Sequence, residues 1–264
     1  MVGDRVTLVV PHRRRRDALL RLLAAVDGWR VLVVDDSDDG LDLDVPRVRL
    51  GGGSGFARAC NAGLAFVTTP CAILLNDDAV PLGDCLERLS RQGGLCGPVL
   101  VGPGGVESTG LDVSSWGRVR QRVDVPVANR QVAALSGACL HLPARVRLDE
   151  RFPHGFEDVE LCLRLGGAWL VAGARCFHEG GGTLSRAAPE AQAHAVTGQM
   201  LCFDRAHEPL VAALHAAQVL REGADWARLR AVARGWRAAR RLRSTPGFPL
   251  SNPRHELSRH GRSP

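Results

Sequence analysis

Two adjacent carboxylates, Asp77 and Asp78, follow an asparagine, Asn76, directly after a short apolar segment. Residues 71–75 have the length and composition of a buried strand, so the polar triplet is expected at the carboxyl end of that strand. In an open parallel sheet, ligands bind at this edge. Adjacent acids repel each other, and a divalent cation relieves the repulsion through oxygen ligands. A polar turn that merely ends a strand is the alternative interpretation.

A second pair of acids, Asp35 and Asp36, follows the apolar residues 31–34. A carboxylate beyond such a strand can accept hydrogen bonds from the ribose or the base of a nucleotide. A solvated, aspartate-rich turn is the alternative, and the choice between the two acids stays open.

Residues 50–63 comprise a glycine-rich loop and the start of the helix into which it leads. The loop amides and the helix dipole could hold a phosphate, although the loop matches neither a Walker motif nor the G-x-G-x-x-G pattern. Arg58 and Asn61 lie three residues apart and would share one helix face toward a common ligand.

Glu157 and Asp158 stand at the start of segment 156–165, which carries a helical apolar stripe. Acids in a first helical turn are stabilised by the helix dipole, which gives this pair a purely structural explanation. A carboxylate delivered to the sheet edge by the preceding loop could instead act as a general base.

His178 follows the apolar residues 168–177 and precedes a glycine-rich stretch. A lone histidine is more often structural or exposed than a ligand. Together with Asp77 and Asp78, it becomes a candidate third metal ligand.

These clusters need a sheet that brings strand ends together, and the first hundred residues alternate as such a sheet requires. Apolar strands indicate burial on both faces, and β-α-β alternation indicates an α/β fold with parallel strands and right-handed crossovers. Strands are predicted at 6–10, 31–34, 48–50 and 71–75, and helices at 17–26, 56–66 and 81–91.

The remainder of the chain has a different texture. Residues 93–117 are glycine-rich and indicate strands with long connections, and a strand is predicted at 138–142. Two short strands are expected within 168–177. Beyond residue 191 the chain is predicted to be mostly helical up to about residue 243.

The composition is that of a soluble protein, with 45% hydrophobic and 23% charged residues among 264. No apolar run approaches the roughly 18–20 residues of a membrane span. The first residues show no secretory signal. The 8 cysteines include no C-x-x-C pair, and several lie in apolar segments. We therefore expect a cytoplasmic protein with reduced cysteines.

A net charge of +6 would suit phosphorylated small molecules, anionic lipid or nucleic acid. The chain has no tyrosine and only 5% aromatic residues, so a base-stacking platform is poorly supplied and no nucleic-acid partner is expected. Segment 225–237 alternates arginine with apolar residues and could lie on the inner face of an anionic membrane. A basic helix packed on the domain is the alternative.

Taken in order, these residues resemble the family 2 glycosyltransferases of the GT-A fold, especially their rhamnosyltransferase-like branch. The resemblance implies a Rossmann-like, mixed and mostly parallel sheet flanked by helices over residues 1–190. A helical C-terminal extension (191–243) and a flexible tail (244–264) would follow. The resemblance extends from about Val6 to Ser185 and rests on the strand ending at Pro11 and on residues 35–36, 55–63, 74–78, 135–140, 156–161 and 178.

The resemblance implies an inverting hexosyltransferase that uses a nucleotide-diphosphate-sugar donor, Mg²⁺ or Mn²⁺, and a small-molecule, glycan or lipid-linked acceptor. Asp78 and His178 would bind the metal, Asp158 would be the general base, and Glu157 would help to position a substrate. Asn76 stands where the D-x-D motif of the family begins with an acid. The donor-binding residues would be Pro11, Asp35, Asp36, Arg58, Asn61, Asn76, Asp77, Ser136 and Gly137.

Two other functions are considered. A sugar-phosphate nucleotidyltransferase would need a basic grip on a triphosphate, which residues 12–16 could supply, but the usual glycine-rich loop before them is missing. A catalytically silent GT-A-like binding subunit would not need Asp78, Asp158 and His178, all of which are present.

Overall fold

The computed structural model describes residues 5–114, 118–152, 154–180, 188–203, 208–223 and 225–244. A large sheet is formed by β1 (Val6–His12), β2 (Val31–Asp35), β3 (Arg47–Arg49), β4 (Cys71–Leu75), β5 (Ala79–Leu82), β6 (Cys96–Gly102), β7 (Gly105–Ser108), β10 (Arg130–Val132), β11 (Cys139–Pro143) and β12 (Ala168–His178). A separate hairpin is formed by β8 (Leu111–Val113) and β9 (Val119–Gln121). The helices are α1 (Arg16–Ala25), α2 (Phe56–Leu64), α3 (Cys85–Gln92), α4 (Glu157–Arg164), α5 (Pro189–Cys202), α6 (Glu208–Arg221) and α7 (Trp226–Leu242).

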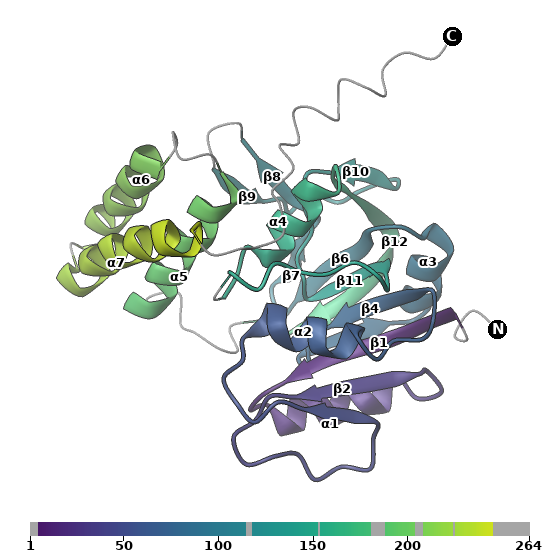
Figure 1. Ribbon diagram of the computed structural model, residues 1–264. Coiled ribbons are helices and arrows are strands. Elements are labelled where there is room, and N and C mark those ends of the chain that lie inside the picture. The colour runs from purple at the N-terminus through teal and green to yellow at the C-terminus, as the bar shows by residue number, and fades with distance from the viewer. Residues whose placement is uncertain are drawn as a thin grey trace.

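The sheet has the order β10-β12-β6-β11-β4-β1-β2-β3, with β5 added to β12 and β7 to β6. Its strands β3, β2, β1 and β4 run parallel to one another, as do β6 and β12. Strand β11 runs antiparallel between β4 and β6, so the sheet is mixed. Figure 1 shows helices on both sides of this sheet and α5, α6 and α7 grouped at one end of the molecule.

The topology brings the functional strand ends together. In the parallel pair β1 and β2, His12 lies opposite Asp35, and β4 ends on the same edge because it is parallel to β1. Strand β12 reaches this edge from the other half of the sheet, because it pairs with β5 and places His178 opposite Ala79. The residues that follow β1, β2, β4 and β12 therefore meet at one edge.

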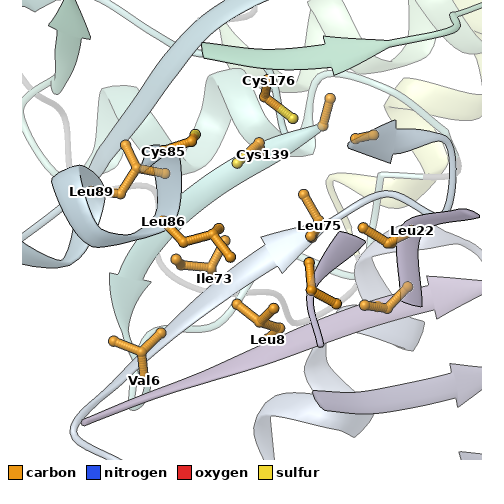
Figure 2. Packing of buried hydrophobic residues seen from close by; sticks show 14 of the residues in the cluster. Val6, Leu8, Leu22, Ile73, Leu75, Cys85, Leu86, Leu89, Cys139 and Cys176 are labelled. Atoms are coloured by element: carbon orange, nitrogen blue, oxygen red, sulfur yellow. The ribbon is translucent and has the colours of Figure 1, made fainter. Parts of the chain in front are cut away.

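Alternate residues of each central strand pack on opposite faces, as the two-residue period of a strand requires. Leu8 and Ile73 belong to a core that includes residues of α1 and α3. Their neighbours Val9 and Leu74 belong to a second core that includes residues of α2 and α4. Figure 2 shows the first core, where Leu22 of α1 and several α3 residues surround β1 and β4. Burial on both faces explains why these strands are apolar throughout.

The strands and helices predicted in the first 75 residues are confirmed to within two residues at each end. The helix predicted at 81–91 is wrong at its start, because residues 79–82 form β5 and α3 begins only at Cys85. Pro81 is tolerated there because β5 pairs with β12 alone. The two short strands expected at 168–177 are one strand, β12, with an irregularity between Val171 and Arg175.

The C-terminal helices form a small unit with their own apolar contacts. Val196 and Met200 of α5 pack with Val211 of α6 and with Val232 and Ala239 of α7. The predicted helical extension is confirmed, whereas the division of the chain after residue 190 stays a prediction. Residues 245–264 of the predicted tail lie outside the described ranges.

Helix α7 has features of both interpretations of segment 225–237, the basic helix packed on the domain and the helix that contacts a membrane. Arg228 is buried and its guanidinium contacts Gln192 and Glu222, as expected of a helix packed on the domain. Arg234 and Trp226 are exposed on the same helix, so contact with a membrane stays a prediction. None of the described helices combines the length and hydropathy needed to cross a membrane, and all eight cysteines are free thiols.

Candidate active site

A cavity of about 450 Å³ opens at the edge where the strand ends meet. One part of its wall is charged and comes from the residues after β1, β2 and β4: Arg13, Arg15, Asp36, Asp77 and Asp78. The wall also includes Pro11, His12, Asn76 and His178. Six of the predicted site residues, from four separate segments of the sequence, therefore line one cavity: Pro11, Asp36, Asn76, Asp77, Asp78 and His178.

The two acids after β2 have different roles. The carboxylate of Asp35 is fully buried and accepts hydrogen bonds from the backbone N–H groups of Ser37 (3.1 Å) and Leu41 (2.7 Å). Burial opposes ionisation, but a hydrogen bond from the Ser37 hydroxyl together with these backbone bonds outweighs it and lowers the pKa of Asp35. Asp36 accepts a 2.9 Å bond from the backbone N–H of Ser54 and lines the cavity. Asp35 thus shapes the loop, and Asp36 is the acid available to a ligand.

Asp78 and His178 approach each other at the base of this wall. Their Oδ1 and Nε2 atoms lie 3.5 Å apart, while Nδ1 of His178 is 3.0 Å from the carboxylate of Glu107. Burial lowers the pKa of His178, but Asp78 and Glu107 outweigh that effect and raise it. Burial likewise works against ionisation of Asp78, whose pKa is nevertheless lowered by His178 and Arg15.

This geometry fits a shared divalent cation. Two ligand atoms that each lie about 2.1 Å from one ion are roughly 3.0–3.5 Å apart, depending on the angle at the metal. The carboxylate of Glu107 on the far nitrogen of His178 is the arrangement that orients a metal-bound imidazole. In the described ranges, no three His, Cys, Asp or Glu side chains form a complete metal site. The remaining ligands would be phosphate oxygens and water, as is usual for Mg²⁺.

Arg15 and His12 contact acidic side chains at this wall. Arg15 contacts Asp78 through Nη1 and Glu179 through Nη2, the latter at 2.8 Å. Asp77 is 2.8 Å from Nδ1 of His12. The amide oxygen of Asn76 is buried without a hydrogen-bond partner among the described residues. An orphaned oxygen in a cavity wall is a group that a bound ligand, water or ion would satisfy.

Glu157 and Asp158 lie at the start of α4, next to the turn before β11. The backbone N–H groups of Gly137 and Val159 donate to Asp158 at 2.7 and 2.8 Å. Burial raises the pKa of Asp158 despite these bonds. Burial and the charge of Asp158 together raise the pKa of Glu157 to about 8. Burial thus disfavours ionisation of both acids, and at neutral pH Glu157 keeps its proton.

The turn that carries these acids is strained. Phe156 has a φ of 72°, a left-handed conformation that is rare for a bulky side chain. Helix α5 presses against this turn at Gly198, where a Cβ atom would lie 2.8 Å from the carbonyl oxygen of Gly155. The C-terminal helices thus take part in holding the turn before α4, and α5 also contributes residues to the cavity.

Five of the predicted donor-binding residues do not line the cavity: Asp35, Arg58, Asn61, Ser136 and Gly137. Arg58 is exposed and Asn61 is buried, and neither lines the cavity. The side-chain amide of Asn61 donates to Leu148 and Glu150 and accepts from the N–H of Leu148, each at 2.9 Å. Asn61 thus ties α2 to the loop after β11. The structure gives no support to the prediction that Arg58 and Asn61 face one ligand.

The turn before β11 lies behind the cavity wall. The carbonyl of Ala138 accepts a 2.9 Å bond from the N–H of Asn76, which joins this turn to the end of β4. The hydroxyl of Ser136 accepts a 3.3 Å bond from the N–H of Ala138. A Cβ on Gly137 would lie 3.4 Å from both Phe56 and Asp158, so the glycine permits close packing there.

Several residues in or next to the cavity were not predicted as site residues of a glycosyltransferase. His12, which ends β1, and Arg15, which follows it, were considered only as part of the basic segment 12–16 that a nucleotidyltransferase would need. The sequence could not predict a role for Glu107, because this residue acts through His178 and lies 71 residues away from it in the chain. His154 and His194 carried no motif at all, yet both line the cavity.

Comparisons with known proteins agree with this architecture. The family model described as Glycosyl transferase family 2 matches residues 7–92. Pre-mycofactocin glycosyltransferases from the CDC 1551 / Oshkosh and H37Rv strains of Mycobacterium tuberculosis are each 32% identical over 198 residues. The match covers 66% of this chain and 41% of each relative. The chain therefore spans about two fifths of the length of these curated relatives.

Two solved structures show the same fold. GalNAc-T7, crystallised with UDP, GalNAc and Mn²⁺, is 12% identical with a TM-score of 0.60, covering 88% of this chain and 53% of its own. Residues 1–349 of Staphylococcus aureus TarS in complex with UDP-GlcNAc are 11% identical with a TM-score of 0.54, covering 90% and 82%. The mixed, mostly parallel sheet flanked by helices is thus of the GT-A type.

Proposed function

The chain belongs to glycosyl transferase family 2, and from this premise we propose that it transfers a sugar from a nucleotide-diphosphate donor to an acceptor hydroxyl with inversion. The observation that carries the proposal is the convergence of Asp36, Asp78 and His178 on one cavity. The proposed general base, Asp158, does not itself line the cavity but follows closely after Phe156, which does. Which branch of the family the chain joins, including the predicted rhamnosyltransferase-like branch, stays a prediction.

The donor would lie along the charged wall. Asp36 offers the carboxylate that accepts hydrogen bonds from a ribose or a base. Arg13 and Arg15 add positive charge to the same wall, where a diphosphate would find hydrogen-bond donors. The relatives crystallised with UDP, UDP-GlcNAc and Mn²⁺ support a donor of this class and a divalent ion.

Asp78 and His178 would hold Mg²⁺ or Mn²⁺ together with oxygens of the diphosphate. When bound, the metal neutralises the charge that builds on the leaving diphosphate. The carboxylate of Glu107 would accept a hydrogen bond from Nδ1–H of His178, and this tautomer leaves the lone pair of Nε2 available for the metal. The neutral carbonyl of Asn76 is an additional oxygen on the same wall.

Asp158 would take the proton of the acceptor hydroxyl. The acceptor oxygen forms a bond to the anomeric carbon from the face opposite the diphosphate, and the bond from that carbon to the phosphate oxygen breaks. The diphosphate leaves with the electron pair. Burial makes Asp158 more basic than an exposed aspartate, which favours proton transfer. Glu157 stays protonated beside it and helps to keep the turn in place.

A donor screen tests the proposal. Thermal shift and donor hydrolysis would be measured with UDP-, GDP- and dTDP-sugars in Mn²⁺, Mg²⁺ and EDTA, for the wild type, Asp78→Asn and the exposed control Asp84→Asn. The expected result is metal-dependent stabilisation by one nucleotide family, lost only in Asp78→Asn. Release of pyrophosphate from a nucleoside triphosphate and a sugar phosphate would favour a nucleotidyltransferase. Failure of every donor to bind would favour a silent binding subunit.

A further inference from the structure

Part of the cavity wall, here called the uncharged end, is formed by the start of α2, by the strained turn before α4 and by α5. Among the described residues, none of those that line the cavity from these three segments is an arginine, aspartate or glutamate. They offer aromatic rings, small side chains and two imidazoles: Phe56, His154, Phe156, Ala191, His194 and Ala195.

The two histidines form a pair that spans the turn and the helical extension. The ring centroids of His154 and His194 are 6.1 Å apart with an interplanar angle of 66°. Burial lowers the pKa of both rings, and the proximity of His194 lowers that of His154 further. Neutral imidazoles each provide one N–H donor and one acceptor nitrogen. Within the described ranges, the ring nitrogens of His154 and His194 form no hydrogen bond with another protein group.

The uncharged end adjoins the proposed base. His154 and Phe156 precede Asp158 by four and two residues in the same turn. From the other side, Phe56 and Asp158 both pack against Gly137. A hydroxyl compound resting on the aromatic rings would therefore present its oxygen beside Asp158, while the donor lies toward Asp36 and Asp78.

We propose that this uncharged end is the acceptor site and that it selects a neutral, hydroxyl-rich ring, such as a sugar, over a phosphorylated or carboxylated acceptor. The inference rests on the proposed glycosyltransferase function and narrows its acceptor class. His154 and His194 are specificity-determining residues that pair with acceptor hydroxyls. Phe56 and Phe156 receive the apolar face of the ring.

The physical reason is the cost of leaving a charge unpaired. A buried anion needs a cation or several donors to replace its hydration, and the arginines of the cavity lie at the donor end. A sugar hydroxyl both donates and accepts, as does a neutral imidazole, so each can satisfy the other. The C–H face of a sugar ring in turn buries apolar surface against the phenyl rings.

The test uses the full chain with the donor and metal found in the screen. Two neutral probes, methyl and p-nitrophenyl β-D-glucopyranoside, are compared with two anionic ones, glucose 6-phosphate and glucuronic acid. Binding is followed by saturation-transfer NMR and transfer by mass spectrometry. Neutral probes are expected to bind, and the anionic ones to bind at least about tenfold more weakly, the effect of one unpaired polar group.

Variants separate this inference from the proposed function. His194→Phe and His194→Asn are expected to raise KM for the neutral probe about tenfold, the loss of one hydrogen bond. Donor binding should stay intact in both, which also shows that they fold. Arg234→Ala, on the exposed side of α7, is the matched control. Donor binding without binding of either neutral probe, equal use of the anionic probes, or an unchanged KM in both variants would overturn the acceptor assignment alone. Absence of donor binding in the wild type would overturn the proposed function itself.

Discussion

The backbone N–H of Gly137 donates a 2.7 Å hydrogen bond to Oδ2 of Asp158. This contact joins the turn before β11 to the start of α4, across 21 residues of sequence. A second bond, from the N–H of Val159, holds the other oxygen of the same carboxylate. The orientation of Asp158 is therefore fixed by two backbone groups, as a general base requires.

Asp158→Asn is expected to lower kcat for sugar transfer by about 10²–10⁴-fold, because a general base contributes that much. The amide oxygen can still accept the bond from Gly137, so the fold and donor binding should be preserved. Transfer kinetics and calorimetric titration with the donor would measure the two effects. Equal loss of donor affinity would show that Asp158 belongs to the donor site instead.

Glu107→Gln tests the support of the metal site. The variant keeps the size of the side chain but removes the negative charge beside Nδ1 of His178. Loss of such a partner typically weakens metal affinity by about 10–100-fold. Electron paramagnetic resonance of Mn²⁺ in the presence of UDP would measure it, with Glu87→Gln on α3 as the control. An unchanged Mn²⁺ affinity would place the ion away from His178.

Asn61→Ala and Arg58→Ala should separate a structural residue from an exposed one. Asn61 makes three hydrogen bonds at the junction of α2 with Leu148 and Glu150. Its removal leaves buried groups unpaired and should cost about 1–3 kcal/mol. Arg58→Ala should leave both the melting temperature and donor affinity unchanged. Weaker donor binding in Arg58→Ala would restore the original expectation that this residue touches the donor.

Part of the fold and of the candidate site could be predicted from the sequence alone. The strands and the strand-end acids were predictable, because apolar runs and parallel topology place polar residues such as Asp36 and Asp78 on one edge. The roles of Asp35 and Asn61 were not, because Asp35 accepts hydrogen bonds within its own loop and Asn61 bonds to the loop after β11. Glu107 and His194 were also not predictable, because only tertiary packing brings β7 to His178 and α5 to the cavity.

Glu157→Gln should change the pH dependence of stability. The pKa of Glu157 rises from 4.5 to about 8 in the folded state because of burial and Asp158. Between these values the unfolded chain releases a proton that the folded chain retains, so folding stability falls as pH rises. Glutamine mimics the protonated form and removes this loss. The variant should therefore exceed the wild type in melting temperature more at pH 8 than at pH 5. A difference independent of pH would mean that Glu157 is ionised in the fold.

Gly198→Ala tests whether α5 sets the position of the turn before α4. A Cβ at Gly198 would lie 2.8 Å from the carbonyl oxygen of Gly155 and 2.9 Å from Cβ of Phe156. These distances are too short for real contacts, so either α5 or the turn must move. Overpacking of this kind costs about 1–3 kcal/mol. Because Phe156 holds a left-handed conformation directly before Glu157 and Asp158, a shift of the turn should displace the proposed base.

Gly235→Ala provides the matched control. A Cβ at Gly235 would lie 2.5 Å from the carbonyl oxygen of Ala193, so this variant separates α7 from α5 without a clash against the turn. Both variants should lower the melting temperature, by about 2–4 °C for each kcal/mol lost. Only Gly198→Ala should lower kcat strongly at unchanged donor affinity, because it alone presses on Gly155 and Phe156. Equal losses of kcat in the two variants would mean that the helical extension supports the domain without positioning its catalytic turn.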